Sequence, residues 1–243
     1  MQSIAALNNL VKNSSRIVFF GGAGVSVPSG IPDFRSETGL YRQKQRYGQS
    51  AEVMLSHNYF FSHTETFYRF YRECMLYPDA RPNAAHRKLA QLERAGRLTA
   101  VVTQNIDGLH QQAGSKNVLE LHGSVHRNHC LNCSRYHSLS DLLSAGDIPR
   151  CSVCGGLLKP DVVLYGEQLD DDTVDAAIDA IAACDLLIVG GTSLSVWPAA
   201  GLIRYLKKGA KLAIVNLSPT EADSIADVVV CESIEKVFAQ IEL

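Results

Sequence analysis

Two pairs of cysteines carry the clearest chemical signal in this sequence. Cys130 and Cys133 form one Cys-x-x-Cys pair, and Cys151 and Cys154 form a second pair after seventeen intervening residues. Four thiolates at this spacing are typical of a tetrahedral zinc site, and a shell closed by four protein ligands makes the ion structural. A disulfide or redox pair is disfavoured, because neither pair opens a helix after a strand. We therefore predict one structural Zn²⁺.

A polar run, Gln104, Asn105, Ile106 and Asp107, follows the short apolar segment 100–102. Buried polar groups without partners cost free energy. The run is therefore either a solvated loop or engaged with a ligand, and the residues alone leave both readings open.

His122 is the predicted catalytic residue. It lies between Leu121 and Gly123, just after the apolar pair 118–119, where a side chain can reach the carboxyl edge of a sheet. The ordinary pKa of histidine, near neutrality, suits proton removal at cellular pH. His110 is the main competitor, and we expect it on a helix after the polar run, in a structural role. The remaining six histidines are assigned ordinary structural or surface roles.

A glycine-rich turn, Gly22-Ala23-Gly24, follows the apolar run 17–20. Glycines at such a turn let the backbone approach a pyrophosphate. The dinucleotide pattern is imperfect, because Val27 stands where a third glycine is expected and no acidic residue closes a second strand about twenty residues later. Alone, the turn is equally compatible with a tight connection that binds nothing.

Two further apolar runs end in small or polar residues. Gly191, Thr192 and Ser193 follow the run 186–189, and Asn216 follows the run 212–215. Ligands of open α/β sheets bind at the carboxyl ends of the strands. Taken with the glycine turn, these ends predict a nucleotide site.

The elements that must position these residues alternate between strands and helices. Apolar runs at 17–20, 100–102, 186–189, 212–215 and 228–230 are continuous, which is typical of a parallel sheet covered on both faces. Helical patterns lie at 84–95 and 173–183, with a short amphipathic helix before the first strand. The fold class is therefore α/β, with a doubly wound sheet. An aromatic-rich segment, 39–80, predicts a helical insertion that packs aromatics over the sheet edge.

Composition excludes some functions. The chain has 243 residues, 46% hydrophobic and 20% charged, and its 23 basic and 25 acidic residues give a net charge of −2. Such a balance argues against a zinc-knuckle module that binds nucleic acid. No apolar run approaches the ~20 residues needed to span a membrane, and the N-terminus lacks a secretory pattern. We expect no membrane partner and a cytoplasmic location.

The motifs together resemble the sirtuins, the NAD-dependent protein lysine deacylases. The resemblance rests on 22–26, 31–35, 104–110 and 121–123 with the four cysteines, and it extends from about residue 16 to about 234. It implies a Rossmann-like NAD-binding domain formed by residues 1–38, 81–125 and 159–243. A smaller domain would combine the helical insertion, 39–80, with the zinc module, 126–158.

The resemblance also implies site residues. Phe34 would cover the nicotinamide side of the cofactor, whereas a surface turn capped by Asp33 is the alternative from the residues alone. NAD contacts would come from Gly22, Ala23, Val27, Asp33, Phe34, Arg35, Gln104, Asn105, Ile106, Asp107, His122, Gly191, Thr192, Ser193, Asn216 and Ile234. The substrate peptide would add a strand against Val163, Leu164, Gly166, Glu167 and Ser195, a mode that reads backbone more than side chains.

The implied reaction removes acetyl groups from lysine side chains of proteins, with nicotinamide and O-acetyl-ADP-ribose as products. His122 would deprotonate a ribose hydroxyl after the acyl oxygen has displaced nicotinamide. Mono-ADP-ribosyl transfer from the same NAD site is the alternative. Acetyl should be preferred to succinyl, because the Tyr-x-x-Arg pair of desuccinylating relatives is incomplete: Tyr68 is followed by Tyr71, and Arg72 is one residue further. Tyr71→Arg should then raise succinyl activity, provided that Tyr68 faces the acyl tunnel.

Overall fold

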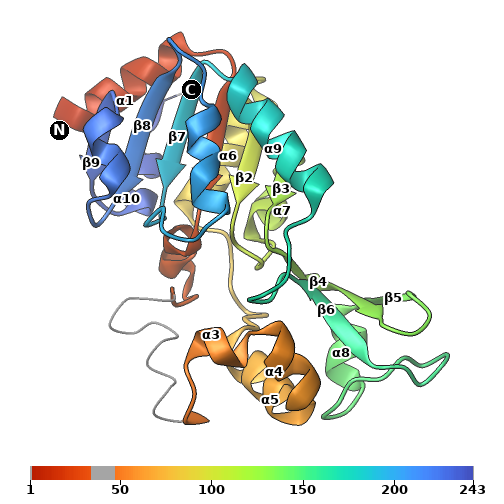
Figure 1. Ribbon diagram of the computed structural model, residues 1–243. Helices are drawn as coiled ribbons and strands as arrows, with labels where there is room; N and C mark the ends of the chain where they lie inside the picture. Colours follow the sequence, from red (N-terminus) through yellow and green to blue (C-terminus); the bar gives the residue numbers. More distant parts are fainter. Residues whose placement is uncertain (1, 34–46, 243) are drawn as a thin grey trace.

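The computed structural model describes residues 2–33 and 47–242, which form two β-sheets with surrounding helices (Figure 1). The α-helices are α1 (Gln2–Asn13), α3 (Ala51–Met54), α4 (His57–Ser62), α5 (Thr64–Cys74), α6 (Ala84–Arg94), α7 (Leu109–Ala113), α8 (Leu139–Ser144), α9 (Asp171–Ala183) and α10 (Ile234–Ala239). Short 3₁₀ helices are η1 (Ala23–Val25), η2 (Val27–Ser29), η4 (Ala199–Tyr205) and η5 (Glu221–Ile225). The strands are β1 (Ile17–Gly21), β2 (Leu98–Thr103), β3 (Val118–Glu120), β4 (Gly123–Cys130), β5 (Tyr136–Ser138), β6 (Leu158–Val162), β7 (Leu186–Gly190), β8 (Lys211–Asn216) and β9 (Val228–Cys231).

The larger sheet has six strands in the order β3-β2-β1-β7-β8-β9, and every neighbouring pair is parallel. This order is that of a dinucleotide-binding Rossmann sheet. The predicted α/β class and the predicted parallel strands are confirmed. Chain order reverses between β1 and β7, so the loops after these two strands diverge to opposite faces and leave a crevice at the carboxyl edge.

Both faces of this sheet are covered, which explains why its strands are apolar without interruption. Successive side chains of a strand point to opposite faces. Ile17 and Phe19 of β1 pack in one core cluster with α1, α6 and α10, whereas Val18 and Phe20 pack in another with α9 and η4. All four side chains are fully buried.

The two longest predicted helices form where their first residues can be capped. α6 begins after Asn83, whose side chain accepts a hydrogen bond from the Ala85 amide. α9 begins two residues earlier than predicted, because the Asp170 carboxylate accepts from the Thr173 amide and so acts as the N-cap. Both helices lie along the large sheet, as Figure 1 shows.

The smaller sheet is antiparallel, with the order β5-β4-β6, and it carries the cysteine loops. The described part of the aromatic-rich segment, 47–80, is helical as predicted. Its expected packing over the edge of the large sheet is wrong. Phe60, Phe67 and Tyr71 instead cluster with Val125 and Val162 of the small sheet. These strands offer the apolar face that the helices need, because the large sheet is already covered by its own helices.

The 3₁₀ turns after β1 end just before the part of the chain that contains Phe34 and Arg35, and these two predicted residues lie outside the described ranges. Within residues 2–33 and 47–242, no helix combines the length and the apolarity that crossing a membrane requires.

Candidate active site

A cavity of about 850 Å³ lies at the carboxyl edge of the large sheet. Segments that follow β1, β2, β3, β7, β8 and β9 form one side of it, and the segment after β6 forms another. The predicted residues on its wall are Gly22, Ala23, Val27, Asp33, Gln104, Asn105, Ile106, Asp107, His122, Val163, Leu164, Gly166, Glu167, Gly191, Thr192, Ser193, Asn216 and Ile234. Ser195 is the described exception: it is exposed, and its hydroxyl lies 2.6 Å from that of Ser193.

Hydrogen bonds join three of the strand ends. Gln104 Nε2, after β2, donates to Thr192 Oγ1 at 3.1 Å. The Thr192 amide, after β7, donates to Asn216 Oδ1 at 3.0 Å, and Asn216 Nδ2 donates back to the Thr192 carbonyl at 2.9 Å. Residues separated by more than 110 positions thus form one polar wall, which is where the sequence pattern expected a nucleotide.

The glycines of the first turn allow two loops to pack directly on each other. The Gly24 amide donates to the Gly191 carbonyl at 2.8 Å, and a Cβ at Gly24 would lie 2.8 Å from Gly191 Cα. Gly191 also adopts a φ of +60°, which glycine tolerates best. The loops after β1 and β7 can therefore approach closely at the point where the strand order reverses.

The polar run after β2 is a bonded network and not a solvated loop. Ser26 Oγ donates to Asp107 Oδ2 at 2.6 Å, and Asn105 Nδ2 donates to Ser26 Oγ at 3.1 Å. The Leu109 amide donates to the other Asp107 oxygen at 2.9 Å. Burial raises the pKa of Asp107, and these hydrogen bonds oppose that rise. Ser26, which is 1% exposed and lies on the cavity wall, was given no role from the sequence, although it follows the glycine turn directly.

His122 is held in one tautomer by the backbone. Its Nδ1 lies 3.0 Å from the Gln104 carbonyl, and because a carbonyl only accepts, Nδ1 carries the proton. Nε2 then carries the free lone pair of the neutral ring. Burial lowers the pKa of His122, and the hydrogen bond to Gln104 offsets part of that effect. The side chain on the cavity wall is therefore a neutral base at pH 7.

His110 lies on α7, so its predicted helical position is confirmed. It is 1% exposed and its ring centroid lies 4.7 Å from that of His86 on α6. Burial lowers the pKa of both histidines, that of His86 to about 4. Neither side chain is on the cavity wall among the described residues. His110 thus packs between α7 and α6 and does not compete with His122 for a ligand.

His126, to which the sequence assigned an ordinary structural or surface role, lies on the cavity wall. Its Nε2 donates to the Asp107 carbonyl at 3.0 Å, which ties the polar run to β4. Alternation along the strand could not have found it, because Gly123 has a φ of +73° and interrupts the extended backbone between His122 and His126.

The predicted peptide segment is fixed on both sides by its backbone. The Val163 amide donates to the His122 carbonyl at 3.0 Å. The Tyr165 amide donates to the Leu55 carbonyl at 2.9 Å, and the His57 amide donates to the Tyr165 carbonyl at 2.9 Å. One edge of this segment therefore contacts the catalytic corner, and the other contacts the helical insertion.

Glu167 has an internal role in the same segment. Its carboxylate accepts from the Leu164 amide at 2.9 Å, from Lys159 Nζ at 3.0 Å and from His57 Nδ1 at 2.9 Å. The pKa of Glu167 is lowered by these donors and by the Lys159 charge, against the effect of burial. Glu167 lies on the wall, but its charge is already matched within the protein.

The four cysteine sulfurs lie within 4.8 Å of one another. Cys130 Sγ is 3.4 Å from Cys154 Sγ, and Cys133 Sγ is 3.8 Å from Cys151 Sγ. A tetrahedral ion with Zn–S bonds of about 2.3 Å separates its sulfurs by about 3.8 Å. The donor set therefore fits the predicted structural zinc, and no histidine of the described residues joins the group.

The tyrosines and the arginine considered for acyl preference do not line the cavity. Tyr68 is fully buried and its hydroxyl donates to the Leu158 carbonyl, so it does not face the cavity. The condition for the Tyr71→Arg prediction is not met. Tyr71 is also fully buried, and its hydroxyl has no partner among the described residues, so an arginine there would bury a charge. Arg72 donates to the carbonyls of Gly146 and Asp147, which directs it away from the cavity.

A Rossmann-order sheet, a neutral, half-buried histidine at its carboxyl edge and a four-thiolate cluster define a dinucleotide-binding α/β protein with a zinc module. Residues 22–198 match the sequence model of the Sir2 family. A protein of Clostridium acetobutylicum named NAD-dependent protein deacetylase is 57% identical over 98% of this chain and 97% of that protein. A protein of the same name from Clostridium perfringens is 53% identical over 98% of both.

Solved structures agree. A Sir2 enzyme with a deacetylated p53 peptide and 3'-O-acetyl ADP ribose superposes with a TM-score of 0.89 at 39% identity, covering 97% of this chain and 96% of that one. A Sir2–p53 peptide–NAD⁺ complex gives 0.87 at 39% identity, covering 98% and 96%. This chain belongs to the Sir2 family.

Proposed function

We propose that this protein removes acetyl groups from lysine side chains of proteins in an NAD-dependent reaction, which yields nicotinamide and O-acetyl-ADP-ribose. The observation that carries the proposal is His122, a neutral base held by the Gln104 carbonyl on the wall of a cavity large enough for a dinucleotide. The relatives' shared name, NAD-dependent protein deacetylase, supports the same activity.

The NAD contacts follow from the wall. Gly191, Thr192, Ser193 and Asn216 would hold the phosphates and the adenosine ribose, with Ile234 near the adenine. The remaining proposed contacts follow β1 or β2, and two of them, Phe34 and Arg35, lie outside the described ranges: Gly22, Ala23, Val27, Asp33, Phe34, Arg35, Gln104, Asn105, Ile106 and Asp107. Support comes from the hydrogen bonds among these strand ends, which preorganise donors and acceptors around one cavity.

When bound, NAD supplies the ribose carbon that loses nicotinamide and the hydroxyl that receives the acetyl group. The chain supplies the base: His122 Nε2 takes the proton from that hydroxyl while Nδ1–H remains bonded to Gln104. Burial keeps the ring unprotonated beforehand, because it disfavours the charged form. Ser26 holds the Asp107 carboxylate, and Asn105 holds Ser26 in turn, so that Asp107 would be fixed where the nicotinamide end binds.

The peptide would bind in an extended form against 163–167 and Ser195. The segment runs between His122 and the helical insertion, and its backbone is fixed at both edges. Recognition through the backbone predicts a loose sequence preference.

The cysteine cluster would hold zinc as a structural ion, since four thiolates leave no open ligand position. We propose the division into a NAD-binding domain (1–38, 81–125 and 159–243) and a small domain (39–80 and 126–158), supported by the separate sheets and core clusters. We also propose a cytoplasmic location.

Mass spectrometry of an acetylated peptide, incubated with and without NAD, tests the function. We expect a loss of 42 Da (one acetyl group, about 42 by its formula) only with NAD. Mono-ADP-ribosyl transfer would instead attach radiolabel from NAD to protein, and that outcome without deacetylation would replace our proposal.

A further inference from the structure

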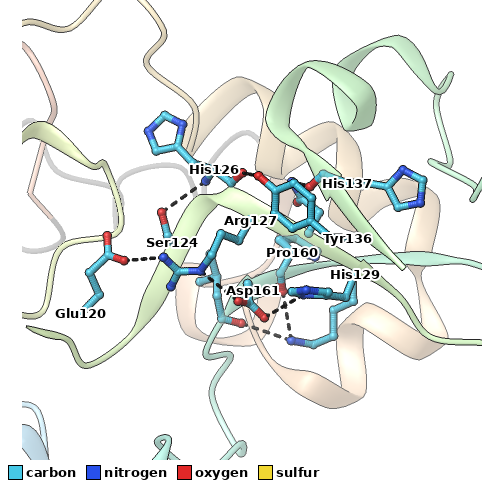
Figure 2. Close-up of polar contacts among 12 residues, drawn as sticks. Glu120, Ser124, His126, Arg127, His129, Tyr136, His137, Pro160 and Asp161 are labelled. Carbon is cyan, nitrogen blue, oxygen red and sulfur yellow. Dashed lines mark hydrogen bonds and ion pairs between the residues drawn. The ribbon is translucent and has the colours of Figure 1, made fainter. Parts of the chain in front are cut away.

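Arg127 of β4 lies between two carboxylates that belong to different strands (Figure 2). Its Nη1 lies 2.7 Å from Glu120 Oε2, at the end of β3. Its Nε lies 3.1 Å from Asp161 Oδ2, in β6. One guanidinium therefore connects the large sheet to two strands of the small sheet.

These two carboxylates lie on either side of the corner that carries His122. Glu120 precedes His122 by two residues. Asp161 passes over the residue that follows it: a Cβ at Gly123 would lie 1.7 Å from the Asp161 carbonyl oxygen, and Gly123 has a φ of +73°. Only glycine fits this close approach. Arg127 thus fixes the chain before and after the catalytic side chain.

The Glu120 end of this link is the less replaceable one. The Glu120 side chain is 7% exposed, whereas those of Arg127 and Asp161 are 43% and 42% exposed. A carboxylate with so little contact with water needs a partner, and among the described residues Arg127 is the cation that pairs with it. A planar guanidinium can serve two carboxylates at once from different nitrogens, which a single ammonium does less well.

The position of His122 depends on the same corner. Its Nδ1–H donates to the Gln104 carbonyl, and its own carbonyl accepts from the Val163 amide at 3.0 Å. A small shift of residues 120–123 would lengthen the first bond and move Nε2 away from its target. Arg127 itself is not on the cavity wall among the described residues, so it touches neither proposed substrate.

We propose that Arg127 is a positioning residue for His122: by pairing with Glu120 and Asp161, it holds the corner at which the base can act. This inference rests on the proposed deacetylase function. It predicts that loss of Arg127 slows the step that needs the base and spares the earlier departure of nicotinamide.

Two assays on the full-length protein separate these steps. The first measures NAD-dependent deacetylation of an acetylated peptide. The second measures incorporation of radiolabelled nicotinamide into NAD in the presence of that peptide, which needs seated substrates but no proton transfer to His122. Arg127→Ala should lower deacetylation about 10- to 100-fold, as expected for a misplaced catalytic group, and should retain exchange, which we also expect of His122→Ala. Arg127→Lys should retain part of the deacetylation.

Lys211→Ala is the matched control. Lys211 pairs with Asp227 at 2.7 Å, but it begins β8, at the edge of the sheet opposite the cavity. Both activities should stay at the wild-type level. If Arg127→Ala does not fold, the same two assays on Glu120→Gln test the inference.

Three outcomes are decisive. Wild-type deacetylation by Arg127→Ala, or by Glu120→Gln in its place, overturns the inference. An equal loss of deacetylation and exchange also overturns it, because Arg127 would then act on folding or binding in general. A wild-type protein that does not deacetylate with NAD would refute the proposed function instead.

Discussion

The cavity and the cysteine cluster differ in how far apart in the sequence their residues lie. The cluster gathers four ligands from residues 130–154, two short loops of one small sheet. The cavity gathers its residues from 22 to 234, and it does so through the segments that follow the six strands of the large sheet and β6 of the small sheet. A metal site of fixed spacing is local, whereas a cofactor site at a sheet edge exists only when the whole sheet is folded.

The two regions should also respond differently to mutation. The polar groups of the cavity are bonded to one another without any ligand, so a single loss there should leave the fold intact. The small module around the cysteines has a core cluster of only Cys130, Cys151 and Leu158 among the described residues. Its folding should depend on the ion, since metal binding and folding are linked in small metal modules.

The largest effect is expected from Cys151→Ser. A hydroxyl is a poor zinc ligand, and the binding free energy of structural zinc reaches about 10–16 kcal/mol in small peptides. Zinc measured by atomic absorption should fall from one per chain, and Tm should fall with it. Cys231→Ser is the control, because Cys231 is exposed and lies outside the cluster. Metal-free protein with full stability and activity would contradict the structural role of zinc.

His122→Ala should give the reverse pattern. Deacetylation should fall about 10²–10⁴-fold, the usual cost of losing a general base, while Tm and NAD binding stay close to wild type. His63→Ala, an exposed histidine of the helical insertion, should change none of these. Turnover near the wild-type rate in the His122 variant would show that another group is the base.

A smaller effect is expected from the acyl group itself. Within the described ranges, no lysine or arginine lies on the cavity wall, and Arg72 is bonded elsewhere. Burying a neutral polar group without a partner costs about 1–3 kcal/mol, and an ionised carboxylate costs more, so kcat/KM for a succinyl peptide should be at least about 10-fold below that for its acetyl counterpart. A butyryl peptide controls for size. Succinyl turnover equal to that of acetyl would reveal a cation that we have not identified.

The smallest effect should appear on mild acidification. It separates the catalytic His122, which affects the rate, from the structural histidines, which affect stability. Burial lowers the pKa of His122, and the neutral ring is the active form, so kcat/KM should stay level down to pH values below about 6.5 and then decline. Acidification should also lower the free energy of unfolding through the buried His86 and His110. The unfolded chain takes up their protons near pH 6.5 while the folded chain does not, so their contribution is present above that pH and is lost as the pH falls.

Profiles of kcat/KM and of Tm between pH 5 and pH 8 (a range of about 3 units around the ordinary histidine value) check both statements. A Tm that rises on acidification would contradict the assignment of neutral buried histidines. A rate that already declines above pH 7 would mean that His122 is protonated more easily than its burial implies.

Several features followed from the sequence alone, because they depend on local patterns. Continuous apolar runs identified five of the six strands of the large sheet, since a strand buried on both faces has no polar side. They missed β3, which has three residues that are only half-buried. Cysteine spacing identified the metal cluster, since two knuckles place four sulfurs within reach of one ion. His122 stood out because it comes shortly after the apolar pair 118–119, where a side chain can reach the carboxyl edge of a sheet.

Tertiary structure decided what depends on partners distant in the chain. The aromatic insertion packs on the small sheet because the large sheet was already covered. Ser26 joins Asp107, and His126 joins the same loop, only because β1, β2 and β4 meet there. Tyr68 turned out to donate to Leu158. The sequence by itself thus determined most elements of the large sheet and which residues can do chemistry. Only the folded sheet decided which of them share a cavity, because contacts between residues distant in the chain leave no local periodicity to read.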